Sequence, residues 1–405
     1  MEDEPKTLLV TLTGKDRPGV TSTMFAALSA AGVEVLDIEQ IVLRRRLLLG
    51  ILVTAPRDWK KLRDVIERTA AELDMNVEVD RGAGDNRSRP ADRSHITLIG
   101  RPLKASAMAA IAGRIADAGA NIDRIERMAR YPVTAIELHV SGAPADTLRP
   151  VLTAEAVRLG IDLAVQRESL HRRGVRLIVM DVDSTLIQGE VIEMLAAHAG
   201  QEAEVARVTE AAMRGELDFE QSLRERVARL EGVPATALDE VYDSIELAPG
   251  ARTMVRTLRR LGYRFAIVSG GFTQITDRLA AELGIHFTRA NELEIVDGVL
   301  TGRIVGDVVD RAGKADALRE FAAEVGVPLD AVIAIGDGAN DLDMLNAAGL
   351  GIAYNAKPMV RDAAHTSVNV PYLDTVLYLL GISREQIEEA DAEVGIVTPA
   401  PPVLD

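Results

Sequence analysis

Hydrophobic and polar positions follow two different periods along this chain, and the change of period separates two halves. In the first half, short apolar runs at residues 7–13 and 95–100 each lead through a turn into a helical pattern of apolar positions. The positions that share one helix face are Met24, Phe25, Leu28 and Ala31 after the first run, and Met108, Ile111 and Ile115 after the second. Two predicted strands, a second helix and a last strand follow in both places, ending near Val79 and Gln166.

The first half therefore contains two copies of one unit. Aligning Gly32 with Gly119 also matches Ile38 with Ile125 and Glu39 with Glu126. The order βαββαβ favours a ferredoxin-like fold, in which two helices cover one face of a four-stranded antiparallel sheet. We expect these domains at residues 1–81 and 95–168, joined by a flexible polar linker at residues 81–94.

In the second half, apolar strands alternate with helices, which is typical of a parallel α/β sheet. The pattern predicts a Rossmann-like domain at residues 175–382, with a helical insertion at about 190–247 that caps it. Asp218 and Gln221 have the spacing of a capping box at the start of one insertion helix. Asp297 and Gly298 indicate a β-hairpin, and residues 383–405 are expected to be a frayed tail.

Polar residues gather where the predicted strands of the second half end, the usual ligand-binding edge of such sheets. The clusters are Asp181 and Asp183 after residues 175–180, Ser269 and Gly270 after 264–268, Lys314 in a polar loop at 311–314 that leads into a helix, and Asp337, Asn340 and Asp341 after 331–335. One aspartate at a strand end commonly caps a helix, but four clusters at one edge indicate a site.

Composition narrows the chemistry. The 405 residues include 46 Lys and Arg against 62 Asp and Glu, and a net charge of −16 argues against nucleic-acid or membrane-surface binding. No apolar run is long enough to span a bilayer, and the acidic first residues lack the apolar stretch of a signal peptide. The absence of cysteine excludes disulfides and a thiolate nucleophile and fits a cytoplasmic location. None of the six histidines lies in a motif, so we expect them to be structural or exposed.

A carboxylate at a strand end is a feasible nucleophile toward phosphorus. Asp181 would attack in line and form an aspartyl-phosphate, while Asp183 would handle a proton. Because an anion must then attack an anion, we expect Mg²⁺ to be bound by Asp181, Asp337 and the backbone carbonyl of Asp183. Lys314 and Ser269 would hold the phosphoryl oxygens.

These motifs strongly resemble those of the haloacid-dehalogenase (HAD) superfamily: Asp181-x-Asp183-x-Thr185, Ser269, Lys314 and Gly336-Asp337-x-x-x-Asp341. The insertion and the loops around Ser269 and Asp337 are similar to the phosphoserine phosphatase family. That resemblance implies a Mg²⁺-dependent phosphoric monoester hydrolase that converts O-phospho-L-serine into L-serine and phosphate, the last step of L-serine biosynthesis. It also implies substrate-binding residues: Glu190 pairs with the ammonium, Arg226 with the carboxylate, and Met213 and Phe219 wall the pocket. Gly270 and Asn340 belong to the same set, with Asn340 supporting the surroundings of the nucleophile.

The two repeats resemble ACT domains, which bind small molecules and pair sheet to sheet. The resemblance rests on residues 14–20 and on the Gly32 turn into residues 33–41. It implies that Gly19 opens a helix whose N–H groups receive a ligand carboxylate and that Asp16 holds its ammonium. The second copy, with residues 100–104 at this turn, lacks the aspartate and the second glycine. We expect regulation by L-serine or another amino acid, or dimerisation into a homodimer.

Two alternatives stay open from the sequence. One is a HAD phosphatase or phosphotransferase for another small phosphomonoester. The other is an amino-acid-sensing regulator with an inactive α/β domain, against which the intact set Asp181, Asp183, Lys314 and Asp337 argues. An ATP-driven ion pump, which also forms an aspartyl-phosphate, is excluded because the chain lacks a membrane span.

Overall fold

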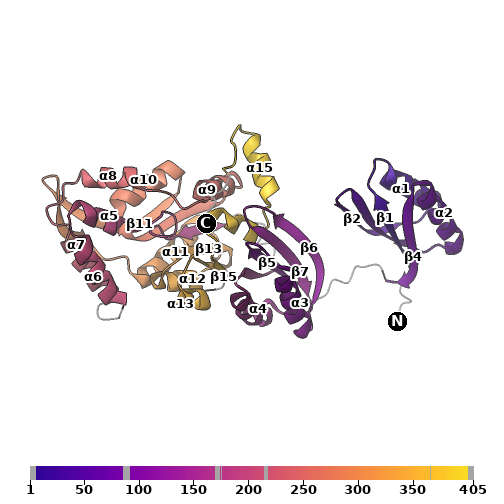
Figure 1. Ribbon diagram of the computed structural model, residues 1–405, viewed down its shortest axis with the longest axis horizontal. Helices are drawn as coiled ribbons and strands as arrows, with labels where there is room; N and C mark the ends of the chain where they lie inside the picture. The colour runs from indigo at the N-terminus through magenta and orange to yellow at the C-terminus, as the bar shows by residue number, and fades with distance from the viewer. Residues whose placement is uncertain are drawn as a thin grey trace. The chain divides into compact units, whose positions relative to one another are not determined.

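The structure is a computed structural model that describes residues 6–84, 92–168, 174, 176–213, 218–364 and 366–399. The chain divides into two compact units, Met1–Pro90 and Ala91–Asp405. Figure 1 shows the helices and strands of both. Among the described residues, no helix combines the length and the apolar character that a bilayer crossing needs.

The first unit is one ferredoxin-like domain, as the repeat predicts. Its elements are β1 (Lys6–Lys15), α1 (Val20–Ala30), β2 (Val35–Leu43), β3 (Arg46–Thr54), α2 (Trp59–Glu72) and β4 (Met75–Ala83). The strands lie in the order β2-β3-β1-β4 and all pair antiparallel. Alternate residues of β1 and β3 pack against Met24, Leu28 and Ile66 of the two helices, which leaves the other sheet face outside this core. β4 extends into the predicted linker because it pairs with β1 as far as Ala83.

The second unit opens with the other copy of the fold. Its elements are β5 (Ser94–Gly100), α3 (Ala105–Asp117), β6 (Asn121–Ala129), β7 (Thr134–Ser141), α4 (Ala145–Leu159) and β8 (Asp162–Arg167). The strand order repeats that of the first copy, but the sheet continues beyond β8 through β15 (Thr366–Val368) into the catalytic sheet. Eleven strands of the described chain therefore form one continuous sheet. The sequence did not reveal this join, because β15 has only three residues.

The catalytic part is built around the parallel strands β9 (Leu177–Met180), β10 (Arg264–Phe272), β13 (Val332–Gly336) and β14 (Leu350–Tyr354). β11 (Phe287–Val296) and β12 (Val299–Val305) form the expected hairpin through Asp297 and Gly298, which both have positive φ. Alternate residues of β9 face two separate cores, so helices cover both faces of this sheet. The helices around the sheet are α9 (Ala251–Arg260), α10 (Thr273–Leu283), α11 (Arg311–Val325), α12 (Leu342–Ala347), α13 (Pro358–Ala363) and α14 (Val376–Leu379).

The described residues of the segment expected to be the cap form four helices: α5 (Val191–His198), α6 (Glu202–Met213), α7 (Phe219–Ala228) and α8 (Ala237–Ser244). In Figure 1 they lie on the side of the catalytic sheet away from β5–β8. The predicted capping box is present, because the Asp218 side chain accepts from the Gln221 N–H and the Gln221 side chain accepts from the Asp218 N–H. This reciprocal capping fixes where α7 begins.

Two sequence expectations need correction. Residues 311–314 are not a loop but the first turn of α11, whose cap is Asp310 accepting from the Gly313 N–H. The first turn of a helix tolerates polar residues and glycine, so the composition of residues 311–314 resembles that of a loop. The described part of the tail is not frayed either. Ser383 caps α15 (Arg384–Ala392), Ile387 is buried, and Asp391 binds two arginines of α9.

Candidate active site

Three neighbouring parallel strands bring the predicted residues to one sheet edge. β9 lies between β10 and β13, with Met180 level with Ile267 and Ile335. The three parallel strands end on the same side of the sheet. Asp181 and Asp337 directly follow β9 and β13, and Ser269 lies near the end of β10, so the three residues meet at this edge. The hydrogen bond from the Asp181 N–H to the Ile335 carbonyl (2.9 Å) continues the pairing to the first residue of the site.

Asp181 is buried and held by both oxygens. Its Oδ1 accepts from the Val182 N–H (2.7 Å), and its Oδ2 lies 2.9 Å from Lys314 Nζ. Burial, followed by the charge of Asp341, raises the pKa of Asp181 well above its ordinary value. The surroundings therefore destabilise its negative charge, which is the condition in which a carboxylate gains most from a nearby cation.

Lys314 is a buried cation between two carboxylates. Its Nζ donates to Asp341 Oδ1 (2.7 Å) as well as approaching Asp181. Burial disfavours its charge, but Asp181 and Asp341 raise the pKa of Lys314 above its ordinary value, so the ammonium stays charged. Asp341 is fixed in turn because its Oδ2 accepts from the Gly338 N–H (3.0 Å). The position of Lys314 within the first turn of α11 makes this ammonium a rigid part of the site.

Asp183 faces the same site because the chain turns directly after it. Ser184 adopts a positive φ of 56°, and residues 183–186 form a turn instead of continuing the strand. Asp183 Oδ1 accepts from the Val191 N–H (2.8 Å), and its Oδ2 accepts from Ser269 Oγ (3.2 Å). Burial raises the pKa of Asp183. A carboxyl group that is both oriented and easily protonated is suited to proton transfer.

Glycine is required beside Asp183 and Ser269. A Cβ atom at Gly271 would lie 2.9 Å from both Asp183 Oδ2 and Ser269 Oγ, and one at Gly270 would lie 3.0 Å from the Phe219 ring. The Gly271 N–H donates to Ser269 Oγ at 2.7 Å. The last, irregularly paired residues of β10 can therefore approach Asp183 and the cap helix only with small residues.

The carboxylates at this edge form a group that could hold a metal ion. One oxygen each of Asp181, Asp337 and Asp341 lie within 4.8 Å of one another. Asp337 Oδ1 accepts from Thr185 Oγ1 (2.9 Å), and burial, followed by the charge of Asp341, raises the pKa of Asp337 to about 6. The three carboxylates are hard oxygen donors, and their negative charges repel one another. A Mg²⁺ ion prefers such donors and would offset this repulsion, so these residues fit the ion.

Above these residues lies a small cavity of about 80 Å³. It is lined by Asp181, Asp183, Glu190, Ile192, Phe219, Arg226, Gly270, Gly271, Asp337 and Asn340. The cavity thus brings cap residues over the catalytic edge. Ser269 and Lys314 do not line it but are fully buried behind its wall.

Glu190 and Arg226 bring opposite charges into the cavity. Glu190 accepts from Ser184 Oγ (3.2 Å), and burial, followed by Asp183, raises the pKa of Glu190 to about 7. Burial lowers the pKa of Arg226, whose Nε donates to the Ser222 carbonyl of its own helix (3.3 Å). A ligand that carries both an ammonium and a carboxylate would offset both desolvation costs.

The remaining predicted residues lie elsewhere. Met213 ends α6, and its side chain lies outside the described residues. Asp16 and Gly19 belong to the first unit, where the Asp16 N–H donates to the Arg45 carbonyl (2.8 Å) and Gly19, with a φ of 97°, caps α1. No structural observation brings a ligand to that turn.

Two residues of the site were missed or under-used in the sequence. In the sequence, Asp341 is only the end of the Gly336-Asp337-x-x-x-Asp341 motif, whereas in the structure it is the second partner of Lys314. Asn291 is buried in β11, donates to the Gly270 carbonyl (2.8 Å) and accepts from the Val309 N–H (2.8 Å). Its only signal in the sequence is an amide within a strand, and such a residue has many structural explanations.

Comparisons with known proteins agree with this arrangement. A model of haloacid dehalogenase-like hydrolases matches residues 178–346, and two ACT-domain models match residues 6–80 and 93–166. A phosphoserine phosphatase of Streptomyces coelicolor is 61% identical over 387 residues, which cover 95% of this chain and 94% of that protein. One of Mycobacterium tuberculosis is 53% identical over 390 residues, covering 95% of each chain. A solved structure, a probable phosphoserine phosphatase from Vibrio cholerae, has a TM-score of 0.57 at 36% identity and covers 73% of this chain and 88% of its own.

Proposed function

The chain belongs to the phosphoserine phosphatases, HAD hydrolases that here carry two N-terminal ACT domains, and on this premise we propose how its residues hydrolyse O-phospho-L-serine. The observation that carries the mechanism is the pair of the buried Asp181 beside Lys314 and the half-buried Asp183 beside Ser269. We propose that Asp181 is the nucleophile and that Asp183 carries the proton. L-serine, the product, makes the chain a biosynthetic enzyme for that amino acid.

The cavity recognises the amino-acid end of the substrate through charge. Glu190 pairs with the ammonium, and Arg226 accepts the carboxylate in a bidentate contact. Phe219 closes one side of the cavity, and Gly270 leaves room where a Cβ atom would meet the Phe219 ring. Met213 as a second wall rests on the family resemblance alone. The phosphate then points toward Asp181 at the strand edge, with Asn340 beside it.

In the first step, one carboxylate oxygen of Asp181 attacks phosphorus, and the bond between phosphorus and the serine oxygen breaks. Asp183 gives its proton to the leaving serine oxygen, so the alcohol departs neutral. Lys314 and the Ser269 hydroxyl stabilise the phosphoryl oxygens as negative charge shifts onto them. The product of this step is an aspartyl-phosphate at Asp181.

In the second step, water attacks the phosphorus atom of the aspartyl-phosphate. Asp183, now ionised, removes a proton from that water, and the bond between phosphorus and Asp181 breaks. Phosphate leaves, Asp181 is regenerated as a carboxylate, and Asp183 is protonated again. The hydrogen bonds that Asp183 accepts from the Val191 N–H and Ser269 Oγ keep it in place through both steps.

Mg²⁺ is the cofactor that this donor set fits. Asp181, Asp337 and the backbone carbonyl of Asp183 would hold it, with Asp341 beside them as the partner of Lys314. When bound, the ion neutralises charge on the phosphate and on the carboxylates.

The test is a Asp181→Asn variant with phosphate release from phosphoserine as the readout, with and without Mg²⁺. We expect turnover to be abolished while the circular dichroism spectrum and melting temperature stay close to those of the wild type. Near-normal turnover in this variant would exclude Asp181 as the nucleophile. A panel with phosphothreonine and sugar phosphates, with and without an acceptor alcohol, tests the alternatives of another phosphomonoester or a phosphotransferase.

Substrate contacts need a separate test. Replacing Glu190 by Gln or Arg226 by Gln should raise KM much more for phosphoserine than for an aryl phosphate, which has neither ammonium nor carboxylate. Equal effects on both substrates would contradict the assigned contacts.

For the ACT domains we propose amino-acid regulation at the turn of Asp16 and Gly19, or dimerisation, with a homodimer as the assembly. The free N–H groups at the start of α1 can receive a carboxylate. The outer sheet face of the first unit exposes Leu9, Ile41 and Leu48, which supports pairing with a second copy. Calorimetric titration of L-serine into the whole protein and into Asp16→Ala separates the two roles, because only regulation predicts Asp16-dependent heat. A cytoplasmic location likewise stays a proposal.

A further inference from the structure

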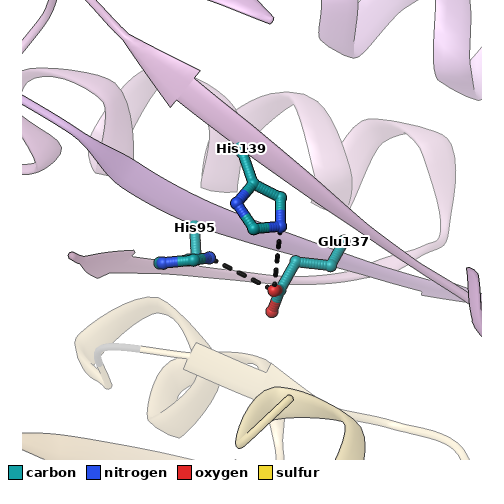
Figure 2. Close-up of side chains that lie close together, drawn as sticks. All are labelled: His95, Glu137 and His139. Atoms are coloured by element: carbon teal, nitrogen blue, oxygen red, sulfur yellow. Dashed lines mark hydrogen bonds and ion pairs between the residues drawn. The ribbon is translucent and has the colours of Figure 1, made fainter. Parts of the chain in front are cut away.

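A second group of candidate metal ligands lies far from the catalytic edge in the sequence, in the second ACT domain. It consists of His95 on β5 and of Glu137 and His139 on β7. His95 is directly opposite His139 in the antiparallel pair, and Glu137 precedes His139 by two residues on the same strand. Residues so placed point to the same face of a sheet. Figure 2 shows the three side chains converging on one point.

The spacing of the donor atoms fits a small divalent ion. His95 Nδ1 lies 3.1 Å and His139 Nε2 lies 3.5 Å from the same oxygen, Glu137 Oε1. All three donor atoms lie within 4.8 Å of one another. In a tetrahedral site with ligands at about 2.0–2.1 Å, neighbouring ligand atoms are roughly 3.3 Å apart. The cluster thus needs little movement to surround an ion.

Hydrogen bonding among these residues does not complete the cluster. His95 Nδ1 is at hydrogen-bond distance from Glu137, but His139 Nε2 is a buried atom without a hydrogen-bond partner among the described residues. Thr97, opposite Glu137 on β5, is fully buried, and its Oγ1 has no such partner either. Native proteins rarely leave buried polar atoms without a hydrogen bond, so two such atoms beside one carboxylate point to a bound species.

We propose that His95, Glu137 and His139 bind one Zn²⁺ ion in the second ACT domain. Two imidazoles and one carboxylate form a common zinc ligand set, which leaves one further position for water. The His139 side chain is 20% exposed and gives the ion a path from solvent, whereas His95 and Glu137 are buried.

The two metal sites of the chain would differ in selectivity. The catalytic group offers only carboxylate oxygens, which suit Mg²⁺, whereas imidazole nitrogen favours Zn²⁺ over Mg²⁺. Excess Mg²⁺ should therefore fill the catalytic group and leave the His-Glu-His cluster to Zn²⁺.

The ion would stabilise the face of the β5–β8 sheet that contacts the catalytic part. Gln166 of β8 lies opposite His95 on the other side of β5, and its Nε2 donates to the Leu379 carbonyl at the end of α14 (2.7 Å). Zn²⁺ would cross-link β5 to β7 within the same row of residues. The proposed role is structural, and it predicts a higher melting temperature for the second unit when Zn²⁺ is bound.

The experiment uses the whole protein, stripped with a chelator and returned to excess Mg²⁺. Zinc is then added, unbound metal is removed, and bound zinc is counted by mass spectrometry. We expect one Zn²⁺ per chain in the wild type and close to none in His139→Asn and Glu137→Gln. His198→Asn, which removes a histidine beside Glu240 on the cap, is the matched control and should keep the ion. Phosphoserine turnover of each variant shows that it is folded.

Equal zinc content in the wild type and in His139→Asn, or no zinc retained by the wild type, would overturn the proposal and leave a hydrogen-bonded cluster. Should the variants fail to fold, Co²⁺ absorption of the wild type decides. A tetrahedral cobalt spectrum with Mg²⁺ in excess supports the site, and a purely octahedral spectrum overturns it.

Discussion

The two ACT domains have the same strand order but differ in what covers the sheet face turned away from their helices. In the first copy, Leu9 on the first strand is 42% exposed, and the facing residues of β4 are polar and exposed. In the second copy, Ile99 on the equivalent strand is 1% exposed, and Ala164 of β8 is fully buried. Both belong to the same hydrophobic cluster as Ile178 and Met180 of the catalytic strand β9.

The difference shows that a sequence repeat need not be a functional repeat. The second copy is built into the catalytic domain through β15 and a shared core, so it acts as a part of that domain. The first copy keeps its outer face open, and Ile41 and Leu48 there have the character of a contact surface. The open face therefore makes the first copy the candidate for the proposed pairing, whereas the outer face of the second copy is part of the shared core.

The largest contrast between the two copies is expected when one aliphatic side chain is truncated on each outer face. Ile99→Ala should lower the free energy of unfolding of the second unit by about 3 kcal/mol, because a fully buried aliphatic side chain leaves a cavity. Leu9→Ala should change that of the first unit by less than about 0.5 kcal/mol, since the side chain is exposed. Urea unfolding of the whole chain, followed with probes in each unit, measures both.

Similar losses at the two positions would contradict the comparison. They would mean that the outer face of the first copy is also covered in solution, and concentration-dependent unfolding would then identify a second chain as the cover.

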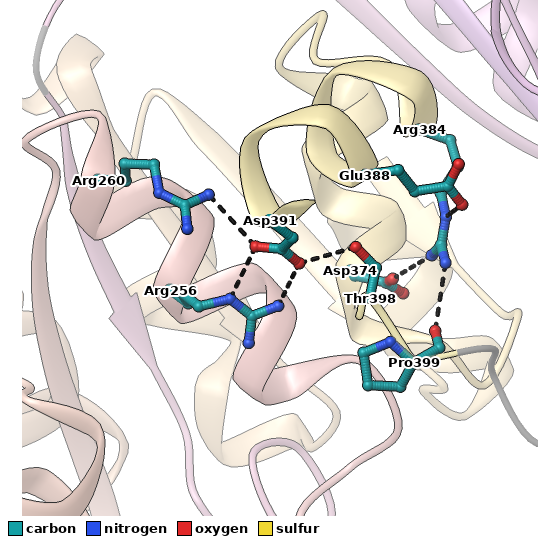
Figure 3. Close-up of polar contacts among 8 residues, drawn as sticks. All are labelled: Arg256, Arg260, Asp374, Arg384, Glu388, Asp391, Thr398 and Pro399. Atoms are coloured by element: carbon teal, nitrogen blue, oxygen red, sulfur yellow. Dashed lines mark hydrogen bonds and ion pairs between the residues drawn. The ribbon is translucent and has the colours of Figure 1, made fainter. Parts of the chain in front are cut away.

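A smaller effect is expected at the C-terminal helix α15, which has no counterpart in the first copy. Asp391 is buried and accepts from Arg256 Nε (3.0 Å), Arg260 (3.3 Å) and Thr398 Oγ1 (2.8 Å), as Figure 3 shows. Asp391→Asn should lower the free energy of unfolding by about 2 kcal/mol, because hydrogen bonds to a charged group inside the protein are lost. Hydrogen exchange of residues 384–392 should accelerate, while that of the first unit should not change.

The pH dependence of this loss has a definite sign. Burial opposes the charge of Asp391, but hydrogen bonds from Arg256 and Thr398 lower its pKa below the ordinary value. Its stabilising contribution is therefore complete above about pH 4, the ordinary range of an aspartate, and is lost as the pH falls through the lowered pKa. The free energies of unfolding of the wild type and of Asp391→Asn should differ at pH 7 and become equal in acid. A difference that grew toward low pH would exclude the ion pair as its cause.

Much of the fold was predictable from local patterns. The two βαββαβ units, the alternating second half, the capping box at Asp218 and the hairpin at Asp297 all follow from periodicity and turn residues. The motif residues were also predictable as a group, because parallel strands end at one sheet edge. Their individual roles remain proposals.

The features that escaped prediction depend on contacts between distant segments. β15 has three residues and no periodic signal, so its pairing with β8 is visible only in three dimensions. α15 has an acidic and polar composition typical of a tail, and what makes it part of the fold is Arg256 and Arg260 from a helix more than a hundred residues earlier. The His95–Glu137 contact joins residues 42 apart and had no motif to indicate it.

The join between the second copy and the catalytic sheet predicts a pH effect of opposite sign. Asp162 of β8 accepts from the Asn369 N–H (2.8 Å) and Nδ2 (2.6 Å) beyond β15. Burial raises the pKa of Asp162 to about 6, despite these hydrogen bonds. The folded protein therefore takes up a proton at Asp162 between pH 7 and pH 4. Because the unfolded chain binds this proton less readily, the free energy of unfolding rises as the pH falls through this range.

Asp162→Asn isolates that contribution. The stability of the wild type relative to the variant should rise by about 1 kcal/mol between pH 7 and pH 5, because a raised acid pKa favours the folded state once protonation begins. Urea unfolding of both proteins at the two pH values measures the difference. A constant or falling difference would show that Asp162 remains ionised in the folded protein.

The smallest change in unfolding free energy is expected on the open face of the first copy, where the assembly should respond instead. Ile41 and Leu48 are directly paired on β2 and β3, and both are exposed. Replacing both by Gln should alter the free energy of unfolding by less than about 0.5 kcal/mol per residue but weaken the proposed homodimer. Sedimentation equilibrium measures the association of the chains. The matched control is Leu261→Gln, because Leu261 is an exposed apolar residue that follows α9. If the double variant and the control both associate as the wild type does, the pairing surface lies elsewhere. An exposed apolar face that can be made polar without any effect on association contributes nothing to assembly.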